Sequence, residues 1–306
     1  MVVATQTETP PASIERDEPD HEYHARSEVG ASMLEEFRRR RQSYRTLYVD
    51  HTATPPAPTP AMQFGTLVHL RVLAPALFAE RVAEPLPEIA PDGKKWLRRK
   101  GSDHERWWQE ELDRRAGKIA ADQGTLARVN AAAAAIKRNP IVARMLDDGE
   151  GEVSHYWTDQ ETGLRCKCRV DWLAGGFALD IKTTPDASPA AFSRRVVQLG
   201  YHRKLAHYAD GLLACHGERV PLVHVAVEPE WPHRVGVYEL DDTDRDGAAL
   251  GRQQRRELLR ELAECLNRDD WSEPWERQVT ALRLPGWAWN DDAYTLGGDD
   301  GCDSDD

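Results

Sequence analysis

The stretch Phe177-Ala178-Leu179-Asp180-Ile181-Lys182-Thr183 decides the expected fold. Large apolar side chains occupy every second position, which is the spacing of a β-strand with one buried face. The alternation puts the apolar residues on one face and leaves Asp180 and Lys182 together on the other. We therefore predict a strand that presents a carboxylate beside an ammonium group.

The segment before this strand predicts its partner. Over Leu164–Leu173 charged residues alternate with apolar ones, and Ala174-Gly175-Gly176 follows as a turn. An antiparallel hairpin through that turn brings Asp171 beside Asp180. Two carboxylates and one lysine then converge on one face of the sheet.

Changes in the apolar period predict the remaining elements. Helical spacing covers 31–49, 64–73, 103–116, 122–146, 190–213 and 252–266, and strand spacing covers 153–158, 164–173, 177–183, 222–228 and 234–240. This order indicates an α/β (α+β) fold, a small mixed sheet with an antiparallel meander, flanked by helices. No glycine-rich phosphate loop follows a strand, so we expect no nucleotide cofactor.

The net charge of −12 is carried by the two ends of the chain. Residues 1–29 hold seven acidic and two basic residues, and residues 290–306 hold seven acidic residues and no basic one, so residues 30–289 are formally neutral. The first segment is poor in apolar residues and is expected to be disordered, and the last is expected to be a flexible acidic tail. One catalytic domain over residues 30–289 is the predicted organisation.

The five cysteines form no paired C-x-x-C spacing. We therefore expect neither a structural zinc site nor an iron–sulfur cluster, which needs four suitably spaced ligands. No apolar run is long enough to cross a bilayer, and the N-terminus lacks the basic and apolar regions of a secretory signal. The sequence favours a cytoplasmic protein that does not contact a membrane.

The predicted cluster suits metal-assisted hydrolysis of a phosphodiester. Asp171 and Asp180 can hold Mg²⁺, with Mn²⁺ as a substitute, and the ion would neutralise the phosphate and activate a water molecule. Lys182 is in a position to orient that water or to help deprotonate it. The short D-x-K pattern also fits an ordinary cross-strand salt bridge, so the cluster alone leaves both interpretations open.

The surrounding sequence resembles the RecE-type (exodeoxyribonuclease VIII) branch of the PD-(D/E)XK nucleases over about residues 30–289. The matching motifs occur in family order, and they are Phe64-Gly65-Thr66-Leu67-Val68-His69, Tyr156-Trp157, Arg169-Val170-Asp171-Trp172, Leu179-Asp180-Ile181-Lys182-Thr183-Thr184, Gly200-Tyr201-His202, Val237-Tyr238-Glu239-Leu240 and Leu284-Pro285-Gly286-Trp287. The resemblance implies a restriction-endonuclease-like PD-(D/E)XK core.

The resemblance also implies roles for individual residues. His69 becomes a metal ligand beside Asp171 and Asp180, the backbone carbonyl of Ile181 a further ligand, and Lys182 the catalytic lysine. Without the family, a histidine on an apolar helix would more often be a core residue with satisfied hydrogen bonds.

Three more positions are candidates for the site. Glu152 matches an acidic position near the family's site and is a catalytic candidate, although a glutamate exposed at the start of a strand fits as well. Relatives commonly carry Q-x-x-x-Y on the following helix, whereas here Lys204 stands in the glutamine position before Tyr208. Lysine keeps a donor for a phosphate, so Lys204 and Tyr208 are DNA-binding candidates. The replacement equally fits reduced activity.

The resemblance predicts a Mg²⁺-dependent 5′ to 3′ exonuclease that resects duplex DNA ends for recombination by single-strand annealing, in a bacterial or phage-infected cell. A ring-shaped homo-oligomer, and an annealing protein bound by the acidic tail, are further expectations. The first alternative is a catalytically weakened DNA-binding or scaffold protein with the same fold. An iron–sulfur nuclease, which the cysteine positions disfavour, and a purely structural protein are the others.

Overall fold

A computed structural model describes residues 10–85, 88–96, 100–240 and 247–284. The chain divides into two units, Met1–Asp270 and Trp271–Asp306, and the candidate site lies in the first. In the second unit the described residues contain a short 3-10 helix, η2 (Pro274–Arg277). Most of the predicted closing motif, at 285–287, and the predicted acidic tail, at 290–306, lie outside the described residues.

A six-stranded mixed sheet forms the centre of the first unit, in the order β1-β4-β5-β6-β7-β8. Its strands are β1 (Ser13–Glu15), β4 (Glu150–Thr158), β5 (Arg165–Ala174), β6 (Phe177–Thr183), β7 (Leu222–Val227) and β8 (Val235–Glu239). Neighbours run antiparallel except β6 and β7, which are parallel. The predicted mixed sheet with its antiparallel meander is therefore confirmed. A separate parallel pair joins β2 (Val82–Ala83) to β3 (Ile119–Ala120).

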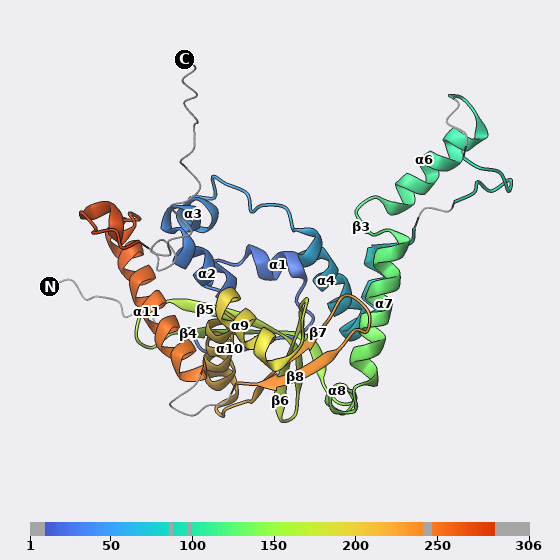
Figure 1. Ribbon diagram of the computed structural model, residues 1–306. Helices are drawn as coiled ribbons and strands as arrows, with labels where there is room; N and C mark the ends of the chain where they lie inside the picture. The colour runs from blue at the N-terminus through green and yellow to red at the C-terminus, as the bar shows by residue number, and fades with distance from the viewer. Residues whose placement is uncertain (1–9, 86–87, 97–99, 241–246, 285–306) are drawn as a thin grey trace, which may run out of the picture. The chain divides into compact units, whose positions relative to one another are not determined.

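Helices cover both faces of this sheet (Figure 1). The helical elements of the first unit's described residues are α1 (Asp20–Ala25), α2 (Ala31–Arg39), α3 (Arg41–Tyr44), the π-helical turn η1 (Arg45–Val49), α4 (Pro60–Leu73), α5 (Pro75–Arg81), α6 (Asp103–Arg115), α7 (Gln123–Arg138), α8 (Pro140–Leu146), α9 (Pro189–Leu199), α10 (Tyr201–His216) and α11 (Gly247–Arg268). None of those in the described part of the chain has the length and apolar composition needed to span a bilayer.

The alternation in β6 decides which helices cover which face. Leu179 and Ile181 are fully buried in a core cluster with residues of α4, α7 and α8. The opposite face of the sheet is covered by α9 and α10, so Asp180 and Lys182 lie under α10. Charged side chains on this inner face need partners there, because an unpaired buried charge is strongly unfavourable.

Three helices that the sequence predicts as continuous are divided in the structure, and the one predicted over 31–49 breaks at the extended residue Arg40 between α2 and α3. Pro140 has no N–H to continue the ladder of α7, and the side chain of Asn139 caps the new helix α8 instead. Gly200 separates α9 from α10 in the left-handed conformation, with φ +71°, which glycine adopts without strain. This last break turns α10 across the sheet, where it carries Lys204 and Tyr208.

The N-terminal segment corrects a prediction. We expected residues 1–29 to be disordered, but within them β1 pairs with β4 and α1 follows. Lys167 donates to the carbonyl of Tyr23 at 2.6 Å, and the buried Arg169 donates to the carboxylate of Glu18 at 3.1 Å. Hydrogen bonds and ion pairs with distant strands thus order the described part of this segment, residues 10–29, and its own composition does not show these contacts.

Glu18 is the centre of this attachment, and its substitution should destabilise the fold. The carboxylate also accepts hydrogen bonds from Tyr156 and Arg26, each at 2.6 Å. Glu18→Gln removes the charge that compensates buried Arg169, and we expect the free energy of unfolding to fall by about 2 kcal/mol. The exposed Glu22→Gln on α1 should change it by less than about 0.5 kcal/mol. Chemical denaturation measures both values, and equal effects would contradict this role.

The same substitution predicts a pH dependence. Burial alone raises the pKa of Glu18, but hydrogen bonds from Tyr156, Ser154 and Arg26 outweigh burial and lower the pKa from 4.5 to about 2. Because the folded-state pKa is depressed, the stabilisation is complete above about pH 4.5 and is lost as the pH falls toward 2. The stability difference between wild type and Glu18→Gln should therefore shrink over this range. A difference that stays constant would argue against the ionised carboxylate as its source.

Candidate active site

The candidate site lies where β5 and β6 separate. The two strands pair as far as Trp172 and Leu179, and β6 then continues beside β7 to Thr183. Asp171 is the next residue of β5 at this fork. Its Oδ2 accepts the backbone N–H of Ile181 at 2.8 Å. The fork therefore joins the Asp171 carboxylate to the backbone of β6 immediately after Asp180.

Helix α4 brings His69 to the same place. Its Nε2 lies 2.7 Å from the carbonyl oxygen of Ile181, and its Nδ1 lies 3.3 Å from Oδ2 of Asp171. A neutral imidazole has one N–H, so one ring nitrogen can donate while the other faces an oxygen with its lone pair. This donor set of imidazole, carboxylate and carbonyl therefore fits a divalent metal ion.

Asp180 is 1% exposed and is surrounded by nitrogen donors. Lys182 forms an ion pair with Oδ2, His224 Nδ1 lies 2.9 Å from the same oxygen, and Lys204 donates to Oδ1 at 3.0 Å. Burial raises the pKa of Asp180, but the two lysines and His224 outweigh burial and hold the pKa well below its ordinary value. Asp180 is therefore a buried, ionised carboxylate with both oxygens hydrogen-bonded.

The pKa values of the two lysines on Asp180 are shifted in opposite directions. Lys182 also donates to the carbonyl of Ile181 at 3.2 Å. Burial lowers the pKa of Lys182 by more than Asp180 raises it. For Lys204, burial also lowers the pKa, but Asp180, Tyr208 and Asp171 together outweigh burial and hold the pKa well above its ordinary value. Lys182 is thus the lysine that exchanges a proton more readily, and Lys204 is a fixed positive charge.

Glu152 and Tyr208 lie around this cluster. Glu152 is half-buried on β4 with φ +56°, and it lies between the β4–β5 pairs Gly151–Trp172 and Val153–Val170. Burial and the charge of Asp171 raise the pKa of Glu152 to about 7. Tyr208 is buried one turn after Lys204 on α10, with its ring 4.9 Å from the lysine Nζ. All the predicted side chains therefore surround one region, and their roles there stay predictions.

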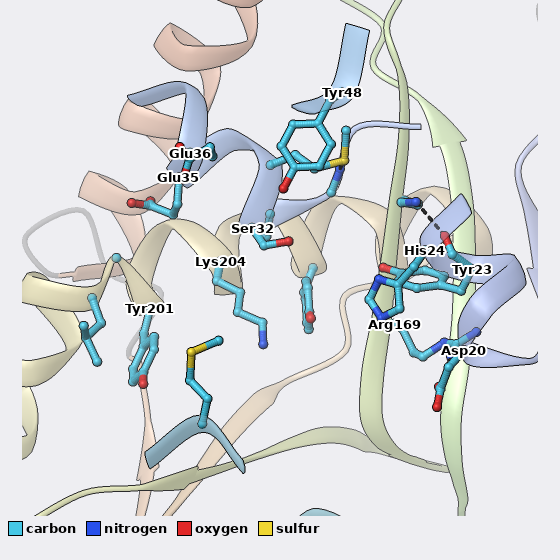
Figure 2. Close-up of a pocket in the computed structure, with 18 of the residues that line it drawn as sticks. Asp20, Tyr23, His24, Ser32, Glu35, Glu36, Tyr48, Arg169, Tyr201 and Lys204 are labelled. Carbon is cyan, nitrogen blue, oxygen red and sulfur yellow. Dashed lines mark hydrogen bonds and ion pairs between the residues drawn. The ribbon is translucent and has the colours of Figure 1, made fainter. Parts of the chain in front are cut away.

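A cavity of about 570 Å³ opens beside the cluster (Figure 2). Lys204 and Tyr201 line it from α10, and Tyr23 and Asp20 line it from α1. The Tyr23 ring also lies 4.2 Å from the guanidinium carbon of Arg169, which joins α1 to β5. Helix α1 of the N-terminal segment thus forms part of the cavity wall. The prediction that this segment is disordered left these lining residues out of the candidate site.

The sequence analysis did not identify His224 as a site residue either. It lies on β7 at the position paired with Asp180, is 1% exposed, and packs its ring 5.7 Å from the rings of both Phe192 and Tyr201. Its Nε2 has no hydrogen-bond partner among the described residues, so the Nδ1 proton that Asp180 accepts fixes the tautomer. The available signal was one polar residue in the apolar strand Leu222–Val227.

Among the described residues, no group of three or more His, Cys, Asp or Glu side chains is arranged to hold a metal ion. The donors that do meet are two side chains, His69 and Asp171, and the backbone carbonyl of Ile181. Asp180, predicted as the second metal carboxylate, is engaged by Lys182, Lys204 and His224 instead. Its role as a ligand stays a prediction.

The fold and this cluster define a PD-(D/E)XK-type domain. Residues 31–278 match the family described as "PDDEXK-like domain of unknown function (DUF3799)", and the chain belongs to that family. The fold is similar to a crystal structure described as a "Putative exonuclease" from Eubacterium rectale, with a TM-score of 0.56 and 11% sequence identity over 89% of this chain and 96% of the other. A comparison with curated proteins finds no match. The predicted restriction-endonuclease-like core is therefore confirmed.

Proposed function

We propose that this chain is a metal-dependent deoxyribonuclease. The observation that carries the proposal is the convergence at one fork of the sheet of Asp171, His69, the Ile181 carbonyl and the Asp180–Lys182 pair. An ordinary cross-strand salt bridge would need only Asp180 and a lysine. It would not need an imidazole that lies between a backbone carbonyl and a second carboxylate, which are donor types that suit a divalent cation.

The residues divide the work of phosphodiester hydrolysis between them. His69, Asp171 and the Ile181 carbonyl would hold the ion, and Asp180 is proposed as a further ligand. A bound Mg²⁺ or Mn²⁺ would neutralise charge on the phosphate and make a bound water more acidic. The lowered pKa of Lys182 makes the loss of its own proton easier, so Lys182 can orient the attacking water and, once neutral, accept its proton. Water oxygen then bonds to phosphorus as the phosphorus–ester oxygen bond breaks, and the leaving oxygen takes up a proton from the solvent.

Lys204 and Tyr208 are proposed as contacts to the DNA strand, because Lys204 lines the cavity beside the cluster with a positive charge. By its resemblance to RecE-type nucleases the chain would act as a 5′ to 3′ exonuclease on intracellular duplex ends in phage or prophage recombination. A ring-shaped homo-oligomer and an annealing protein that binds the acidic tail belong to the same proposal. The polarity and the oligomer come from the resemblance alone.

One digestion experiment tests the exonuclease part. Linear duplex DNA labelled at either the 5′ or the 3′ end, and the same DNA as a covalently closed circle, are incubated with the protein and Mg²⁺. Early release of the 5′ label as mononucleotide, with the circle intact, is expected. Cleavage of the circle would point to an endonuclease, and early release of the 3′ label would reverse the proposed polarity.

A second candidate is a DNA-binding protein that retains the fold with weakened catalysis. The observation that favours it is the ion pair between Lys204 and Asp180, which engages an oxygen of a predicted metal ligand. Duplex binding in a gel-shift assay, without nucleotide release in Mg²⁺ or Mn²⁺, would support this candidate over the nuclease.

A further inference from the structure

We infer that the Lys204 ammonium group takes the place of a second metal ion at Asp180. It thereby restricts the site to a single divalent ion, held by His69, Asp171 and the carbonyl of Ile181. This inference deepens the proposed function and rests on its assignment of a metal site. It concerns how many ions the site accepts, which can be measured without DNA.

The positions of the donors divide the cluster into two sides. On one side, His69 lies with Nε2 2.7 Å from the carbonyl oxygen of Ile181 and with Nδ1 3.3 Å from Oδ2 of Asp171. On the other, Lys204 donates to Oδ1 of Asp180 at 3.0 Å, while Oδ2 receives His224 and Lys182. A second ion would have to approach Asp180 from the side that the Lys204 ammonium already occupies.

The charges of the cluster lead to the same conclusion. Asp171 and Asp180 supply two negative charges, which Lys182 and Lys204 balance before any ion binds. Counting Glu152 as ionised adds one more negative charge. One divalent ion then leaves the site mildly positive, which suits a phosphate, whereas two ions would concentrate several uncompensated positive charges in a region with little water.

Lys204 is also held in this position by its helix. Its neighbour Arg203 is bound by Glu35 of α2, and His202 lies 2.9 Å from Gln254 of α11. A Cβ at Gly200, where α10 begins, would lie 2.5 Å from a side-chain oxygen of Glu35, so the turn is closely packed. Lys204 therefore extends to Asp180 from a fixed backbone, and withdrawing it would leave Asp180 buried with a partner removed.

Calorimetric titration of the metal-free full chain with Mn²⁺ tests the inference. Four proteins are compared at about 0.15 M salt, where weak binding to the acidic termini is screened: wild type, Lys204→Gln, Lys137→Gln and Asp171→Asn. Lys204→Gln keeps a donor for Asp180 without the charge, and Lys137→Gln removes an exposed lysine of α7 as a matched control. Asp171→Asn removes a proposed ligand, so the Mn²⁺ that this variant still binds gives the baseline of binding outside the proposed site. Circular dichroism confirms that each protein is folded.

We expect one ion per chain above the baseline for wild type and Lys137→Gln, and two for Lys204→Gln. Two ions in wild type, or an unchanged single ion in Lys204→Gln, would overturn the inference whether or not the protein cuts DNA. Should Lys204→Gln fail to fold, Lys204→Met is titrated in its place, and a single ion in that variant would equally overturn the inference. Nucleotide release assayed on the same samples reports separately on the proposed nuclease, so the two ideas can fail independently.

Discussion

Lys182→Ala should reduce the rate of metal-dependent DNA hydrolysis by about 10³-fold, within the range of losing a general base or a charge-stabilising donor. Lys182 is 12% exposed at the fork, bridges Asp180 and the Ile181 carbonyl, and has a lowered pKa that suits proton transfer. Asp180 keeps Lys204 and His224 as partners after the substitution. The protein should therefore remain folded while its chemistry is lost.

The comparison with an exposed lysine separates chemistry from general electrostatics. Lys137→Ala on α7 also removes one positive charge and should leave the hydrolysis rate within about twofold of wild type, since distant exposed charges are screened. Single-turnover rates with enzyme in excess over labelled duplex measure both variants. A Lys182→Ala rate close to that of Lys137→Ala would show that Lys182 takes no part in the hydrolysis.

Asp180→Ala should have the largest effect on stability, lowering the free energy of unfolding by about 3–5 kcal/mol. The carboxylate is buried with Lys182, Lys204 and His224 around it. Removing it leaves two ammonium groups together without their shared counter-charge, and burial of an unpaired charge costs far more than the loss of one hydrogen bond. Urea denaturation followed by circular dichroism measures the change.

A second substitution identifies the cause of that destabilisation. Asp180→Ala combined with Lys204→Met removes one of the two unpaired charges, and the double variant should be more stable than Asp180→Ala alone. The exposed Asp113→Ala on α6 should change the free energy by less than about 0.5 kcal/mol. A double variant less stable than Asp180→Ala would show that lost packing, not unpaired charge, dominates.

Local sequence patterns were sufficient for the central hairpin. Strand β6 was predicted with its observed ends, Phe177–Thr183, because strict alternation determines both the element and its buried face. The turn at Gly175-Gly176 then determined the pairing that brings Asp171 to the backbone beside Asp180. His69 depended on family resemblance, since an imidazole on an apolar helix carries no local signal of its ligands.

Contacts between distant segments could not be predicted in this way. The N-terminal strand and α1 are ordered by Arg169 and Lys167, more than a hundred residues further along the chain. Similarly, Lys204 was predicted as a contact for DNA, and its closest partner is Asp180. Which acid a lysine approaches depends on where Gly200 turns α10, and the apolar period of the sequence predicted one continuous helix there.

The measurement that tests the central claim most directly is nucleotide release from linear duplex DNA by the purified full chain, first stripped of metal with EDTA and then supplied with Mg²⁺. We predict no release after stripping, and release that is restored by Mg²⁺. If folded protein that binds duplex DNA releases no nucleotides in either Mg²⁺ or Mn²⁺, then the cluster at Asp171, Asp180 and Lys182 is not the catalytic site of a nuclease.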